Sequence, residues 1–116
     1  MNEMERRIIR KLLELLIKAG FSLSVWDGES YAIMNSRNVD DTLAEMGHTG
    51  EDNLQVSMPD ANDPYGDDGH AIVLIYGNDG HDVIADYVML RTLPSIQDIL
   101  DQVEAFANDL ATETAP

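Results

Sequence analysis

Apolar and polar residues repeat along this chain with two different periods, and the changes of period divide it into elements. Residues 4–19 carry apolar side chains at helical spacing, with Leu12, Leu13 and Leu16 at the centre of the stripe. Gly20 follows directly, and glycine is the commonest residue just after a helix. The pattern therefore predicts an amphipathic helix over 4–19.

Strict alternation, typical of a half-buried strand, begins after this helix. Segments 21–26 and 30–35 both alternate, and the Asp27-Gly28 pair between them is a strong signal for a tight turn. A two-residue turn at that point pairs Leu23 with Ala32 and makes one face of the hairpin apolar. The opposite face is then predicted to hold Ser22, Ser24, Trp26, Tyr31 and Ile33.

The second half of the chain repeats this logic. We expect a short helix over 39–46 capped by Asn38, a brief strand over 54–58, a loop over 59–69, and a hairpin of strands 70–76 and 82–89. A turn centred on Asp79-Gly80 pairs His70 with Met89, Ile72 with Tyr87 and Leu74 with Ala85, and puts Val73, Ile75, Ile84 and Asp86 on the other face. A last helix, with an apolar stripe from Ile96 to Leu110, is predicted after the cap residue Ser95.

The element order is thus α-β-β-α-β-β-β-α. It predicts an α+β fold, with an antiparallel sheet of about five strands and two long terminal helices packed on one face. Residues 1–111 are expected to form a single domain, and residues 112–116 a frayed tail. The other face of the sheet has little left to cover it.

Charge changes the picture of what this domain can bind. The formal net charge is −15 on 116 residues, although the 44% of apolar residues is normal for a globular protein. Five of the seven basic residues precede Ala19, and between Ala19 and Pro116 there are nineteen acidic and only two basic residues. Such a field repels nucleic acid and anionic membranes and attracts basic protein surfaces. No direct nucleic-acid or membrane partner is therefore expected.

The sequence contains few of the residue patterns that catalytic and metal-binding motifs require. There is no cysteine, and no phosphate-binding loop or hydrolase elbow occurs. The 60–68 loop has carboxylates but carries Pro64 where a calcium loop needs an oxygen ligand. His70 and Asp86 are expected on opposite faces of the sheet. We therefore expect a non-enzymatic, cytoplasmic protein without a cofactor or a metal; the alternative is a small-ligand or metal-binding domain, or an enzyme, that uses His70, His81 and nearby carboxylates.

A protein-binding site is the better-supported candidate, because aromatic side chains surrounded by carboxylates are typical of protein interfaces. Asp86 would be costly beside apolar neighbours unless solvent or a basic partner reaches it. The predicted contacts with a partner are Trp26, Tyr31, Ile33, Asp60, Asp63, Asp67, Asp68 and Asp86.

The sequence thus favours a small acidic interaction protein that binds or neutralises a basic protein, of inhibitor, immunity or regulatory type. This acidic, cysteine-free profile is similar to that of nuclease immunity proteins, antitoxins and DNA mimics from bacteria and mobile elements, a likeness of composition that covers no motif. A DNA mimic remains an alternative, and it requires acids spaced like phosphates. A homodimer built on the exposed sheet face or on the broad first helix is a further possibility, and it is compatible with the interaction function.

Overall fold

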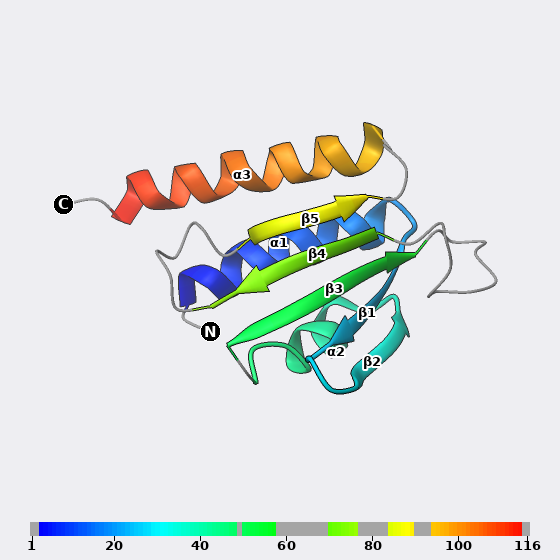
Figure 1. Ribbon diagram of the computed structural model, residues 1–116. Coiled ribbons are helices and arrows are strands. Elements are labelled where there is room, and N and C mark those ends of the chain that lie inside the picture. The colour runs from blue at the N-terminus through cyan, green and yellow to red at the C-terminus, as the bar shows by residue number, and fades with distance from the viewer. Residues whose placement is uncertain (1–2, 49, 58–69, 77–83, 90–93, 115–116) are drawn as a thin grey trace.

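A computed structural model of the chain describes residues 3–48, 50–57, 70–76, 84–89 and 94–114; for residues 57, 70, 71, 84–89, 94–96 and 111–114 it describes the backbone only. The fold is α+β, as predicted, with one antiparallel sheet (Figure 1). In chain order the elements are α1 (Glu3–Lys18), β1 (Ser22–Trp26), β2 (Tyr31–Ser36), α2 (Val39–Ala44), β3 (Glu51–Ser57), β4 (His70–Ile75), β5 (Ile84–Met89) and α3 (Pro94–Thr114).

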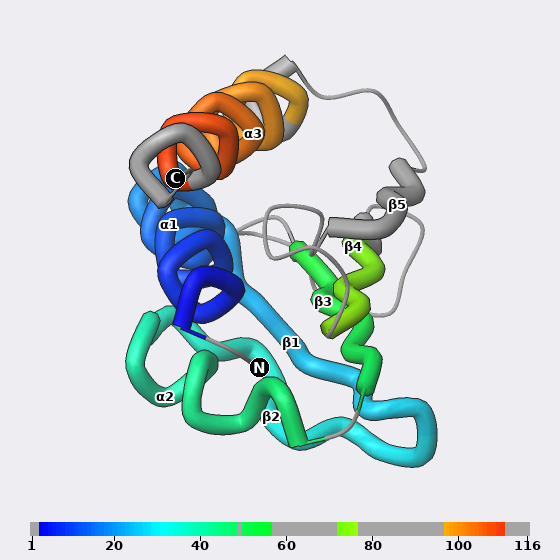
Figure 2. Tube along the Cα trace, turned by 90° about the vertical axis from the view of Figure 1, so that its left-hand side faces the viewer, coloured from blue at the N-terminus to red at the C-terminus, as the bar shows by residue number. Residues whose placement is uncertain are grey.

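The sheet separates two environments. Its strand order is β2-β1-β3-β4-β5, and every neighbouring pair is antiparallel. Figure 2 shows the helices on one side of it, where α3 lies along α1. The side chains that point to this helical layer are almost completely buried: Leu23, Val25, Leu54, Val56, Ile72 and Leu74. The core therefore lies between the sheet and the helices.

Helix α1 ends as the sequence predicts. Gly20 has a φ of 100°, and its N–H donates to the carbonyl of Ile17 while the N–H of Phe21 donates to that of Leu16. These two bonds form a Schellman motif, in which only glycine adopts the left-handed backbone at no steric cost. Phe21 is buried immediately afterwards, so the same turn that stops the helix starts β1 in the core.

The β1–β2 hairpin has a different register from the predicted one. The Asp27 carboxylate accepts hydrogen bonds from the N–H groups of Glu29 and Ser30, which builds a four-residue loop instead of a two-residue turn. Trp26 therefore pairs with Tyr31, and irregularities in the ladder then bring Val25 opposite Ile33. Residues paired across antiparallel strands share a face. The expected placement of Ile33 beside Trp26 and Tyr31 is wrong, because Ile33 packs against the core.

The β4–β5 pair is closer to expectation. His70 pairs with Met89 and Ile72 with Tyr87, as predicted. An irregularity between Val73 and Leu74 then places Leu74 opposite Ile84 rather than Ala85. One extra residue in one strand is the definition of a β-bulge, and it moves the following residue to the other face.

The remaining helices follow local signals. The Asn38 side chain caps α2 by accepting a hydrogen bond from the N–H of Asp41 at 2.9 Å. α3 presents Ile99, Leu100, Val103, Ala107 and Leu110 to the core. It continues to Thr114, so residues 112–114 are helical. Within the described residues, no helix is long and apolar enough to cross a membrane.

Candidate binding face

The side of the sheet away from the helices, called here the open face, is built by alternation along the strands. In β3 the open-face residues Asn53 and Gln55 are half-buried. They alternate with residues that are buried on the core face: Asp52, Leu54 and Val56. In β4 the open-face positions are Val73 and Ile75, which are also half-buried. The open face therefore mixes amide and aliphatic side chains, whereas the core face is almost entirely aliphatic.

Strand register lines up several predicted contact positions in one row across the sheet. Tyr31 pairs with Trp26, Trp26 with Asn53, Asn53 with Val73, and Val73 with Asp86. The two aromatic positions therefore lie at one end of this row and the backbone of Asp86 at the other.

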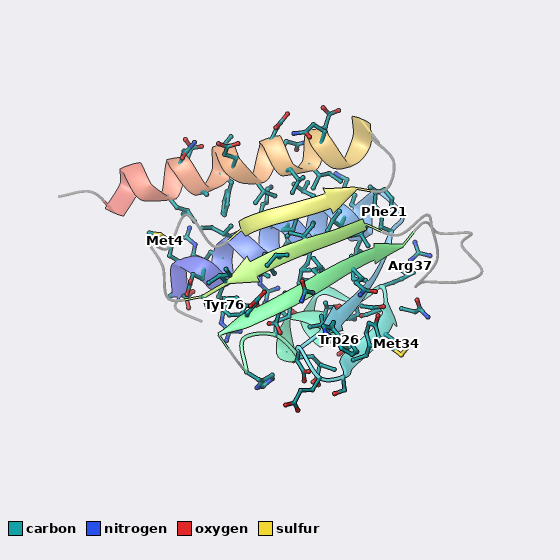
Figure 3. All side chains as sticks on the ribbon, in the orientation of Figure 1. Met4, Phe21, Trp26, Met34, Arg37 and Tyr76 are labelled. Atoms are coloured by element: carbon teal, nitrogen blue, oxygen red, sulfur yellow. The ribbon has the colours of Figure 1, made fainter. Side chains whose placement is uncertain are left out.

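Trp26 and Tyr31 form the best-defined feature of the open face. Their ring centroids are 4.9 Å apart at an interplanar angle of 67°, an edge-to-face contact that stabilises aromatic pairs. The Tyr31 hydroxyl donates to Oε1 of Gln55 on β3 at 2.9 Å, so the ring reaches over β1. Both rings are half-buried, and Figure 3 shows Trp26 at the end of β1. These two contacts hold the Trp26 and Tyr31 rings together on the open face.

A shallow depression of about 410 Å³ adjoins this pair, lined by Asp27, Gly28, Gly50, Glu51, Asn53 and Ile75. Trp26 is adjacent to two of these lining residues, because it precedes Asp27 in the chain and pairs with Asn53 in the sheet. Hydrogen bonds from the Ser30 and Glu29 N–H groups lower the pKa of the Asp27 carboxyl, because they stabilise its charged form. Asp27 is therefore anionic at neutral pH.

A second polar cluster lies on the core side of the sheet. The Asp52 side chain is 2% exposed and accepts hydrogen bonds from the Tyr76 hydroxyl at 2.6 Å and the Gly47 N–H at 2.8 Å. Burial, together with the nearby Asp52 and Glu5 carboxylates, raises the pKa of Tyr76 strongly, so this hydroxyl stays protonated and keeps donating. The cluster joins the turn after α2 to the end of β4, which is a structural role.

Sequence reasoning missed this cluster, although the pattern contains its signal. Asp52 stands in phase with Leu54 and Val56, the buried positions of β3. A carboxylate in the apolar phase of a strand needs hydrogen-bond donors if the strand begins there. The predicted strand began only at residue 54, whereas β3 begins at Glu51.

Most of the other predicted site residues are not described by the structure. Asp60, Asp63, Asp67 and Asp68 lie outside the described residues, as does His81. His48, four residues after the end of α2, places Nε2 at 2.9 Å from the carbonyl of Ala44. His70 pairs with Met89 at the end of β4 that is far from the aromatic pair. In the part of the chain that the structure describes, no group of three or more metal-ligating side chains comes together.

Comparison of the chain with protein-family models, with curated proteins and with solved structures gives no match. Its function is therefore inferred from the geometry and charge described above.

Proposed function

We propose that this protein is a non-enzymatic binding module that engages a basic protein through its open face and so inhibits or regulates it. The observation that carries the proposal is the ordered Trp26–Tyr31 pair on a sheet face that the helices leave uncovered. Rigid aromatic side chains supply much of the binding energy in protein interfaces, because they bury large areas and lose little conformational freedom.

The distribution of charge supports a basic partner. Five of the seven basic residues lie on α1, behind the sheet, where Arg10 pairs with Asp40 at 3.0 Å. Near the β1–β2 loop and the start of β3, the exposed charged residues at the edge of the open face are Glu29 and Glu51, whereas the exposed Arg37 follows the other end of β2. A basic protein would therefore be attracted by the molecule as a whole and meet carboxylates where it lands.

Affinity capture from a native lysate of the producing cells, at 50 and 200 mM NaCl with identification by mass spectrometry, tests this proposal. We expect one basic protein that is retained at a constant ratio at 200 mM NaCl and lost from Trp26→Ala. Phe106→Ala is the matched control, since this half-buried ring lies on the helical layer with the Lys11 ammonium 5.8 Å from its centroid. It should retain the partner.

Two results would count against the proposal. One is a mixture of basic proteins that salt removes equally from both variants, which means that the charge attracts without specificity. The other is concentration-dependent dimerisation that Trp26→Ala abolishes, which would assign the open face to a second copy of this chain.

A DNA mimic is the second candidate, and α3 favours it. Four exposed carboxylates follow one another along its solvent side: Asp98, Asp101, Glu104 and Asp109. The first three are three residues apart, an advance of about 4.5 Å each, comparable with the roughly 3.4 Å per charge along one DNA strand, and Asp109 follows after a longer step of about 7.5 Å. If the captured partner binds DNA, duplex DNA should compete for it, and Asp98→Asn with Glu104→Gln should weaken capture as much as Trp26→Ala does. Competition without that loss would restrict recognition to the open face.

A further inference from the structure

We infer that the depression beside Trp26 receives an arginine side chain. This inference rests on the proposed function and makes it more specific, since it names the group of the basic partner that the open face recognises.

The depression is built on the ends of paired strands. Asn53 pairs with Trp26, and Glu51 pairs with Ile75. The carbonyl of Gly50 accepts a hydrogen bond from the N–H of Tyr76 at 3.0 Å, which ties β3 to β4 at this end. A volume of about 410 Å³ is sufficient for a side chain, since small-ligand clefts range from roughly 300 to 1,000 Å³. These contacts between the strand ends fix the backbone of the walls.

The chemistry of the walls selects a cation with an apolar stem. Asp27 and Glu51 supply carboxylates, Asn53 supplies an amide and Ile75 an aliphatic surface. Among the described residues that line the depression, none is basic. Two carboxylates alone would attract any cation, so the discrimination must come from the residues around them.

Trp26 does not line the depression, but it precedes Asp27 in the chain and pairs with Asn53, and an aromatic ring at this border favours arginine over lysine. A guanidinium is planar, stacks on aromatic faces and is less strongly hydrated than an ammonium, so it loses less on entering a partly apolar site. Its fork of N–H donors also matches carboxylate oxygens, and Asp27 stays in place because two backbone N–H groups hold Oδ1.

The test is an NMR titration of the ¹⁵N-labelled protein with N-acetyl-arginine methylamide at constant ionic strength. The Gly28, Gly50 and Asn53 amide signals report on the walls, and Trp26, the only tryptophan in the chain, adds an indole signal and fluorescence. We expect saturable shifts at these positions, binding at least threefold weaker for the lysine analogue, and none for the neutral citrulline analogue.

Matched substitutions locate the effect. Asp27→Asn keeps an acceptor for the Glu29 and Ser30 N–H groups but removes the charge, and Glu51→Gln does the same on β3; each should weaken binding at least threefold. Asp98→Asn and Glu104→Gln, both exposed on α3, should change it by less than twofold. Gly50→Leu adds a steric test, because a Cβ at Gly50 meets nothing within 4 Å. It should block the depression without disturbing the fold.

Equal shifts with citrulline, no saturation, or equal losses in the α3 variants would overturn the inference. Its failure is distinguishable from failure of the proposed function. If the arginine analogue does not bind but Trp26→Ala still releases the partner, only the inference fails. If the analogue binds while no basic protein is captured, the proposed function fails and the depression remains an arginine site.

Discussion

At the scale of single residues, the bond between Tyr76 and Asp52 carries an energetic prediction. Tyr76→Phe removes the hydroxyl that donates to a carboxylate only 2% exposed, leaving Asp52 with the Gly47 N–H. Removing one partner of a buried charged acceptor costs about 1–3 kcal/mol. We expect the free energy of unfolding, measured in urea, to fall by that amount.

Tyr31→Phe is the control for this prediction. It also removes a hydroxyl donor, but the acceptor is the neutral side chain of Gln55, which is half-buried on the open face. The loss should be at most about 1 kcal/mol. Equal losses in the two variants would show that Asp52 finds another donor when Tyr76 is truncated.

Ionisation of Tyr76 gives a prediction for alkaline pH. Burial and the hydrogen bond to Asp52 raise the pKa of Tyr76 in the folded chain far above the ordinary tyrosine value of 10.0, so above pH 10.0 the folded chain holds a proton that the unfolded chain releases. The contribution of Tyr76 to stability is therefore complete below about pH 10 and decreases as pH rises further. In a titration followed at 295 nm, one of the four tyrosines should stay protonated until the chain unfolds. Tyr76→Phe should lack this late step; if it persists there, another tyrosine is responsible.

At the scale of elements, α2 depends on its cap. It has only six residues, so its backbone supplies few internal bonds, and Asn38 satisfies the Asp41 N–H. Asn38→Ala should lower the free energy of unfolding by about 0.5–2 kcal/mol, whereas Asn38→Ser, which keeps an acceptor, should change it little. Urea unfolding measures both. Equal effects would mean that the cap bond contributes nothing.

The elements also show what local pattern can and cannot predict. The end of α1 at Gly20 and the cap of α2 at Asn38 follow from one or two residues, and both were predicted. The register of β1 against β2 was not predicted. Asp27 can take part in a two-residue turn or in a four-residue loop, and its side-chain hydrogen bonds to the N–H groups of Glu29 and Ser30 select the loop. A bulge such as that at Val73–Leu74 has no local signal, since the packing of both strands decides it.

The candidate site also contains features that the sequence predicts and features that it does not. Trp26 and Tyr31 were placed on one face despite the wrong turn, because the loop and their own direct pairing still bring them together. Ile33, only two residues further, was misplaced by the irregularity in the ladder. The depression beside Trp26 could not be predicted, because Gly50 and Ile75 belong to it only through the pairing of β3 with β4.

At the scale of the whole molecule, a net charge of −15 opposes compactness through self-repulsion. The Debye length is about 30 Å at 10 mM salt and about 8 Å at 150 mM. The first exceeds the radius of gyration of 13.5 Å and the second does not, so added salt should screen most of this repulsion. We expect the melting temperature to rise by several degrees over this range, measured by circular dichroism.

Glu104→Lys provides a check on the cause. This exposed position on α3 changes the net charge by two with little other effect, so the variant should respond less to salt. A melting temperature that does not move with salt in either protein would contradict the prediction.

The packing of α3 on α1 has a consequence for biosynthesis. The ribosome makes α1 first and then the whole sheet before it makes α3. At roughly 5–20 residues per second, synthesis of the intervening chain takes about 4–15 s. During those seconds the side of α1 that packs on α3 lacks this partner, although α2, which also packs on α1, is made within the interval. Nascent chains truncated before Pro94 should therefore bind chaperones more strongly than chains that include α3.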